Sequence, residues 1–430
     1  MKKELKALNS IHTNCFSAYN NKLRGSFTEE SKGIIDTNRK RLNGLGFIFL
    51  LLVLMTNNRV SAQHSTITIE SEYFASDRSV SIATSEGFDS TKSYQLFVIL
   101  DESVLFDYTV SVLNYLSIWK KIPQYVAIGV PNENRWTELQ PKKDESIDDA
   151  PFFKFMQDEL ESIPYVQNAS FRTLVGHSLS ARFALQFFFK NQHYSGVVAV
   201  SPPLIPLIQE EFCDYLSSEK NQNSYVYMCS GDKDLRFHKT FFLETRKNFN
   251  SKKNPNVLLE YFEKQRNTSH SLMPITAIQN GLLFILDDYF NLPSKGIEEL
   301  SSRKNLPDSL LENSYSKIHD IYGLTPEFRT VDFQNFVELY ISKSNFTEAH
   351  RLCDRYIDIT LKGEIYDLID AYYLKGLTFE EEKNYTAALD YYRKGYSIIP
   401  EDVLNKEDFE QDIIRIEQIL SKSKMNKKQK

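Results

Sequence analysis

Three polar side chains of the types that cooperate in nucleophilic catalysis occur along the chain in the order Ser178, Asp234, His270. Ser178 lies in GHSLS, where an apolar run ends and a helical pattern begins. A serine between small neighbours at such a turn is typical of a nucleophile elbow, in which backbone segments approach too closely for a bulky side chain. A serine that merely caps a helix gives the same local pattern. The motif alone therefore leaves both interpretations open.

A serine hydroxyl needs a base, and His270 fits this role best among the histidines considered. The loop RNTSHSLMP, which contains it, follows the strand-like run NVLLEYF, and this gives the chain order Ser, acid, His. His177 adjoins the serine and is expected to pack beneath the turn. We expect His193 at the far end of the following helix and His238 within a helix.

The acid is expected in SGDKDLRFH, which offers both Asp232 and Asp234 after a strand-like run. Asp234 is favoured, because a carboxylate three residues beyond the strand-ending Gly231 can reach back over the sheet. Asp232 would then cap or shape the turn, and the choice between the two stays open. A turn rich in Asp for ordinary conformational reasons is the alternative to both.

Acyl transfer through a serine also needs hydrogen-bond donors for the oxyanion of the tetrahedral intermediate. We expect one from the backbone N–H of Leu179, the residue after the serine. The second is expected from the loop that follows YQLFVILD, at Glu102 and Ser103.

The elements that must position these residues follow a regular pattern. Residues 65–74 and 79–84 are expected to form an antiparallel pair. Six largely apolar runs come next, separated by helix-length segments: 94–101, 124–130, 172–178, 196–202, 224–231 and 256–262. Such runs predict an α/β fold with a mostly parallel sheet covered by helices on both faces. The carboxyl ends of parallel strands share one edge, where chemistry collects.

The C-terminal part is expected to be an all-α helical-repeat domain. Residues 370–400 fit the helix-turn-helix repeat of about 34 residues, with a weaker copy at 345–353, and resemble a tetratricopeptide pair. The packing positions of the stronger copy are Tyr372, Gly376, Phe379, Ala388, Tyr392, Gly395 and Pro400. A protein partner could bind through these repeats. The expected limits are 63–293 for the catalytic domain, 294–324 for a linker and 325–425 for the repeats.

Residues 1–62 read as an N-terminal extension followed by a signal peptide. Basic residues at 39–41 precede an apolar run at 45–55, and Val60-Ser61-Ala62 suits cleavage before Gln63. The apolar run is short for a membrane span, which needs about 20 residues. We expect export to the periplasm or the medium, with a retained membrane anchor as the alternative. Residues 1–38 are long for an export signal.

Composition excludes several classes of function. A net charge of -6 and the lack of a large basic block argue against nucleic-acid binding. The four cysteines give little disulfide signal, and a buried thiol is expected at Cys229. No ligand spacing typical of a metal site occurs, so neither a metal nor a cofactor is expected.

Residues 78–290 resemble the esterase family of α/β hydrolases that includes siderophore esterases, esterase D (S-formylglutathione hydrolase), feruloyl esterases and mycolyl transferases. The stretches that carry the resemblance are RSVSIAT, YQLFVILD, YVAIGVPNENRWTELQP, LVGHSLSARFALQFFFKNQHYSGVVAVSP, GDKD and SHSLMPITAIQNGLLFIL. The resemblance implies a triad of Ser178, Asp234 and His270, with an oxyanion contribution from the loop after Asp101. It also places Arg135 near the mouth of the site, either as a substrate-binding residue or in a structural salt bridge.

Two positions depart from the family pattern. Glu102 stands where the family has glycine after Leu-Asp, and Ser180 stands in place of the last glycine of the elbow. The sequence thus predicts an exported serine hydrolase of carboxylic esters, with a siderophore-like or sugar-linked acyl ester among the candidate substrates. One alternative is an inactive hydrolase-fold protein that acts as an interaction module. Another is an acyltransferase that uses the same triad.

Overall fold

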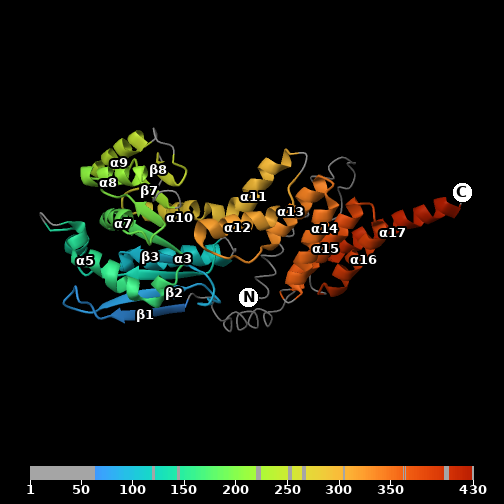
Figure 1. Cartoon of the computed structure of the whole chain (residues 1–430), viewed down its shortest axis with the longest axis horizontal. Coiled ribbons are helices and arrows are strands. Elements are labelled where there is room, and N and C mark those ends of the chain that lie inside the picture. Colours follow the sequence, from blue (N-terminus) through green and yellow to red (C-terminus); the bar gives the residue numbers. More distant parts are fainter. Residues whose placement is uncertain are drawn as a thin grey trace, which may run out of the picture. The chain divides into compact units, whose positions relative to one another are not determined.

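A computed structural model describes residues 63–118, 122–142, 146–218, 224–249, 254–263, 268–303, 306–361, 363, 365–400 and 406–428. Its centre is an eight-stranded sheet in the order β1-β2-β4-β3-β5-β6-β7-β8 (Figure 1). The strands are β1 (Gln63–Ile69), β2 (Arg78–Thr84), β3 (Gln95–Leu100), β4 (Tyr125–Val130), β5 (Phe171–His177), β6 (Gly196–Val200), β7 (Tyr225–Gly231) and β8 (Val257–Phe262).

The sheet is antiparallel at one side and parallel elsewhere. β1 pairs with β2 and β2 with β4 in antiparallel register, whereas β3 to β8 run parallel, with β3 beside both β4 and β5. The strands from β3 to β7 are buried along their whole length except at His177, the last residue of β5. Burial on both faces explains why these strands read as continuous apolar runs.

Helices cover both faces, and each face has its own apolar core. One core joins the sheet to α5–α9, and the other joins it to α3 and α10–α12. The helices are α3 (Glu102–Ile118), α4 (Arg135–Glu138), α5 (Pro151–Lys154), α6 (Pro164–Gln167), α7 (Leu179–Lys190), α8 (Pro206–Ser217), α9 (Arg236–Phe249), α10 (Met273–Ile285), α11 (Asp287–Ser301) and α12 (Leu310–Tyr322), with short turns η1 (Ile147–Asp149), η2 (Phe155–Glu159) and η3 (Leu160–Ser162). The predicted α/β-hydrolase fold, followed by an all-helical region, is confirmed.

The segment 294–324, expected to be a linker, is largely helical. Tyr322 is buried, its hydroxyl donates to the Ile285 carbonyl oxygen at 2.8 Å, and its ring lies 5.0 Å from that of Phe171. The apolar residues on one face of α12 thus pack against the sheet. The charged, serine-rich composition of residues 300–316 does not predict this packing. Two compact units divide between Leu339 and Tyr340. The domain limits given above stay a prediction.

The second unit is built from helices. They are α13 (Thr330–Ser342), which crosses the division, α14 (Phe346–Thr360), α15 (Ile365–Glu381), α16 (Tyr385–Ile398) and α17 (Lys406–Lys428). The helices α15 and α16 pack closely at Gly376, where a Cβ would lie only 2.7 Å from the Tyr392 ring. Asn345 and Asn384 cap α14 and α16 in the same way, each accepting a hydrogen bond from the N–H three residues on.

The expected signal peptide and the extension before it lie outside the described residues. Among the helices that are described, none is both long and apolar enough to cross a lipid bilayer.

Candidate active site

Ser178 occupies a strained turn between β5 and α7. Its φ of 60° and ψ of -117° lie where a residue with a side chain is seldom found. Gly176 makes this turn possible, since a Cβ there would come within 2.6 Å of the Ser180 carbonyl oxygen. The sequence therefore provides a glycine where the strand and the helix approach each other, and the serine is held at the carboxyl edge of the sheet.

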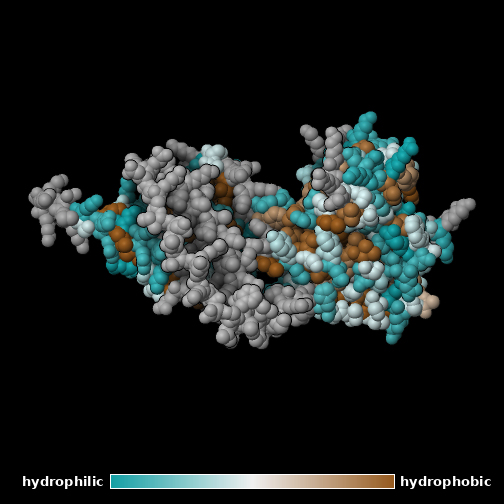
Figure 2. Space-filling view, turned by 180° about the vertical axis from the view of Figure 1, so that it is seen from behind, coloured by the Kyte–Doolittle hydropathy of each residue, from teal (hydrophilic) through white to brown (hydrophobic). Residues whose placement is uncertain are grey.

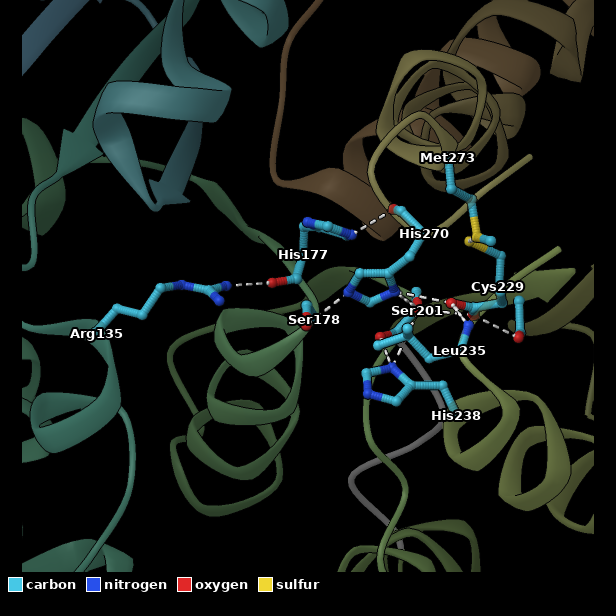
Figure 3. A network of polar contacts seen from close by, with 11 residues as sticks. Arg135, His177, Ser178, Ser201, Cys229, Leu235, His238, His270 and Met273 are labelled. Carbon is cyan, nitrogen blue, oxygen red and sulfur yellow. Dashed lines mark hydrogen bonds and ion pairs between the residues drawn. The ribbon is translucent and has the colours of Figure 1, made fainter. Parts of the chain in front are cut away.

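Three side chains from separate strand ends meet at this edge (Figure 3). His270 Nε2 lies 3.0 Å from Ser178 Oγ, and His270 Nδ1 lies 2.8 Å from Asp234 Oδ1. Ser178 follows β5, Asp234 follows β7 and His270 follows β8. The arrangement allows the imidazole to take a proton from the hydroxyl while the carboxylate faces its other nitrogen.

Both oxygens of the Asp234 carboxylate accept hydrogen bonds. Ser201 Oγ and Ser230 Oγ each donate to Oδ2 at 2.7 Å, and the Leu235 N–H donates to Oδ1 at 2.8 Å. Burial acts to raise the pKa of Asp234, but the hydrogen bonds from His270, Ser201, Ser230 and Leu235 outweigh it and lower the pKa to about 2. Asp234 therefore stays ionised beside His270 at neutral pH.

Ser201 also contacts His270, on the side of the ring that faces Asp234. Its Oγ lies 3.0 Å from His270 Nδ1, whereas Ser178 approaches Nε2. Ser201 is fully buried, and its φ of 50° is a second strained position, at the end of β6. Because its hydroxyl donates to Asp234 and is closed to solvent, the geometry suits it to positioning the acid, and Ser178 to attack.

Ser201 was not among the residues predicted from the sequence, although a usable signal was present. GVVAVSP places a serine directly after a buried run, at the same edge as the elbow. Functional residues gather after parallel strands, and Ser201 follows β6 as Ser178 follows β5 and Asp234 follows β7.

His238 supports Ser201 from α9. Its Nδ1 lies 2.8 Å from the Ser201 carbonyl oxygen, and its ring stands 4.9 Å from the His270 ring. Burial lowers the pKa of His238, which keeps the ring neutral with its proton on Nδ1 to donate to that carbonyl. His238 is helical as expected, and it holds the strained Ser201 backbone beside Asp234.

His177 contacts the base loop instead of packing away beneath the turn. Its Nε2 lies 2.9 Å from the His270 carbonyl oxygen, and the two rings are 4.7 Å apart. Burial, with His270 and Arg135 nearby, lowers the pKa of His177 to about 4. A neutral ring that donates from Nε2 therefore ties the elbow to the loop carrying His270. His193, by contrast, is exposed beyond the end of α7.

The expected oxyanion donors lie at two adjacent helix starts. Glu102 and Ser103 are in the first turn of α3, and Leu179 begins α7, where a helix leaves its N–H groups without intrahelical acceptors. β3 and β5, the preceding strands, are neighbours in the sheet. Asp101, with a φ of 53°, makes the turn into α3.

Asp101 joins these two turns through its carboxylate. Oδ2 accepts from Ser180 Oγ and from Arg135 Nη2, each at 2.7 Å, and Oδ1 accepts from Asn132 Nδ2 at 3.0 Å. Burial acts to raise the pKa of Asp101, but hydrogen bonds from Arg135, Ser180 and Asn132 lower it overall. Ser180, the departure from the family elbow, thus binds the neighbouring loop.

Glu102, the other departure, points its carboxylate to β2. Its Oε1 accepts from Ser81 Oγ at 2.7 Å, and its Cγ occupies the place that a Cβ on Gly129 would need. The side chain therefore crosses β4 to reach β2, away from β5, the strand that Ser178 follows. Gly129 provides the room for this larger residue.

The remaining predicted residues have structural partners. Arg135 pairs with Asp101, and its Nη2 also donates to the His177 carbonyl oxygen at 3.0 Å. Asp232 is exposed and accepts from Tyr261 Oη at 2.9 Å, so it shapes the turn, while Asp234 meets His270. Cys229 is fully buried beside Met273, as expected.

Three residues here are of metal-ligating types. Asp234, His238 and His270 offer atoms within 4.8 Å of one another. Hydrogen bonds among Asp234, His270, His238 and Ser201 already account for this grouping. That the site needs no metal stays a prediction.

Comparisons with known proteins support the fold. No protein-family model matches the sequence, and no curated protein matches it significantly. Among solved structures, an uncharacterised protein from Capnocytophaga ochracea aligns with a TM-score of 0.61 at 17% identity, over 83% of this chain and 100% of that one. An IroE-like serine hydrolase from Shewanella oneidensis aligns with a TM-score of 0.51 at 15% identity, over 67% of this chain and 98% of that one. At these identities the similarity establishes the fold alone.

Proposed function

We propose that the protein is a serine hydrolase of carboxylic esters, with Ser178 as nucleophile, His270 as general base and acid, and Asp234 as the orienting acid. The observation that carries this proposal is the hydrogen-bonded chain from Ser178 Oγ through His270 to Asp234, at 3.0 and 2.8 Å, on a strained elbow. The resemblance of residues 78–290 to an esterase family agrees with it.

In the proposed reaction, Ser178 Oγ attacks the ester carbonyl as His270 Nε2 takes its proton. His270 returns that proton to the departing alcohol, which leaves an acyl-enzyme. A water molecule then gives a proton to His270 and attacks the acyl carbonyl. His270 returns that proton to Ser178 Oγ as the acyl bond breaks and the acid departs. Asp234 holds the imidazole with Nδ1–H toward the carboxylate throughout.

The N–H groups of Leu179 and of the Glu102–Ser103 turn are proposed to bind the oxyanion. Their support is the adjacency of the two helix starts, which Asp101 links to Ser180 and Arg135. Arg135 is assigned a positioning role, because its guanidinium already bonds Asp101 and the carbonyl of the residue before Ser178.

Hydrolysis of p-nitrophenyl butyrate by the native protein and by Ser178→Ala tests the proposal. Removing one member of a catalytic triad costs several orders of magnitude in kcat. We expect hydrolysis by Ser178→Ala to fall to about the background rate. Equal rates for the two proteins would remove the enzyme assignment.

Two further properties belong to this proposal. Export, with cleavage of the signal peptide before Gln63, rests on the sequence pattern. N-terminal sequencing of the mature protein tests it.

A tetratricopeptide-like role in binding a protein partner rests on the matching caps at Asn345 and Asn384 and on the close packing at Gly376. Affinity capture with residues 340–430 present or deleted tests that role.

A further inference from the structure

Large apolar side chains are exposed at the starts of helices and loops that follow the strands. Six of them are between 41% and 71% exposed: Val104, Trp136, Leu235, Phe237, Leu272 and Ile275. They follow β3, β4, β7 and β8, so they belong to the carboxyl edge of the sheet, where Ser178 also lies. We call these six residues the apolar rim.

Contacts connect one side of the apolar rim to the triad. The Leu235 N–H bonds Asp234 directly, at 2.8 Å, and Leu272 lies two residues beyond His270. The Phe237 ring is 6.3 Å from the His238 ring, which is 4.9 Å from the His270 ring. Leu235, Phe237 and Leu272 therefore belong to the segments that carry Asp234 and His270.

The opposite side of the apolar rim is connected to the elbow. Trp136 follows Arg135, whose guanidinium bonds the His177 carbonyl oxygen next to Ser178. Asn134 Oδ1 accepts from the Trp136 N–H at 3.1 Å, which fixes the backbone under this exposed indole. Val104 and Ile275 join the two sides, since the Tyr108 hydroxyl on α3 donates to the Ile275 carbonyl on α10.

Leaving a large apolar side chain in water is unfavourable relative to burying it. Single exposed residues of this kind are ordinary, but a group of them beside a catalytic centre marks a binding surface. The polar groups at this edge are meanwhile bound to one another: Asp101 to Arg135, Asp234 to His270, and Glu102 to Ser81. These charged groups near Ser178 therefore already have partners within the protein, while the apolar rim is exposed.

We infer that the apolar rim binds a large apolar group of the ester, so that the substrate class is esters with an extended alkyl or aromatic moiety. This inference rests on the proposed function. The substrate is the occupant that fits, because the apolar rim and Ser178 lie at the same edge of the sheet, where a permanent partner would compete with the substrate. Burial of a longer apolar group should raise kcat/KM further for each CH₂ that is covered.

The test measures kcat/KM for p-nitrophenyl acetate, butyrate and octanoate below their critical micelle concentrations. The variants are Trp136→Ser and Phe237→Ser. Figure 2 shows hydrophobic residues on one face of the hydrolase unit, the lobe on the right. Tyr115 and Leu243, which are 63% and 40% exposed, provide matched controls. The control variants are Leu243→Ser and Tyr115→Ser. Leu243 is on α9, the helix that also carries Phe237, and Tyr115 is about 20 Å along α3 from the start of that helix.

We expect the native protein to prefer octanoate over acetate by at least about tenfold in kcat/KM. Each rim variant should reduce that preference at least about threefold, losing more activity on octanoate than on acetate, and the control variants should keep the native preference. Equal rates on all chain lengths, or equal losses in rim and control variants, would overturn the inference. Those results would leave the proposed function standing as long as hydrolysis depends on Ser178. Absence of any Ser178-dependent hydrolysis would instead overturn the proposed function.

Discussion

Ser201 Oγ donates to Asp234 Oδ2 at 2.7 Å, and Asp234 Oδ1 lies 2.8 Å from His270 Nδ1. The buried hydroxyl of Ser201, directly after β6, thus donates to the carboxylate oxygen that does not face His270. Because Ser201 is held at a φ of 50° and His238 bonds its carbonyl, this contact depends on a strained backbone as well as on a hydroxyl.

Replacing Ser201 separates these two contributions. Ser201→Ala removes the hydroxyl and keeps the strained backbone, whereas Ser201→Gly removes the hydroxyl and tolerates the positive φ. We expect kcat to fall about tenfold in both, which corresponds to about 1.4 kcal/mol, with KM little changed. Ser201→Gly should unfold at the higher temperature of the two. Unchanged kcat in both variants would show that Ser201 does not position Asp234.

The hydroxyl of Ser180 is expected to stabilise the elbow. It donates to Asp101 and accepts from the His177 N–H at 2.9 Å, and hydrogen bonds to charged groups contribute about 1.5–3 kcal/mol. Ser180→Ala should lower the free energy of unfolding by about that amount, as measured in urea. Ser180→Gly, which restores the family residue, should lower it at least as much. A neutral result in both would mean that the link to Asp101 adds nothing.

Gly176 is expected to tolerate no side chain. A Cβ there would meet the Ser180 backbone at 2.6 Å, and the turn has no room to relax because Gly176 and Ser180 flank the strained Ser178. Gly176→Ala should lose at least about 3 kcal/mol of stability or fail to fold, a magnitude typical of overpacking in a tight core. Gly87→Ala is the control, with a φ of 68° but open space around it. It should lose only about 1–2 kcal/mol. Equal losses would contradict the close approach at the elbow.

His177 is expected to make stability depend on pH. Its pKa is about 4 in the folded protein against 6.5 for the free side chain, so between these values the unfolded chain binds a proton that the folded chain does not. The stability contributed by neutral His177 therefore falls as the pH decreases from 6.5 toward 4. His177→Gln removes this titration and retains an N–H donor. Melting temperatures at pH 7, 6, 5 and 4 should decline less in the variant, and parallel curves would contradict the shift.

The strands were predictable because each is a buried, continuous apolar run, and the polar residues after β5, β7 and β8 indicated Ser178, Asp234 and His270. The side-chain partners within the site were harder to predict. That Ser180 reaches Asp101, or that Glu102 crosses Gly129 to Ser81, depends on which strands are neighbours, and the order β2-β4-β3-β5 is not the chain order. The helix α12 was not predictable from its composition, because its burial against Phe171 involves a contact far away in sequence.

Labelling with a fluorophosphonate probe tests the central claim most directly, since such a probe reacts with an activated serine and leaves a stable adduct. Peptide mass spectrometry of the labelled protein should find one adduct, on Ser178, and His270→Ala should abolish it. An adduct on Ser201, or ester hydrolysis that persists with Ser178 unlabelled, would contradict the assignment of Ser178 as the nucleophile.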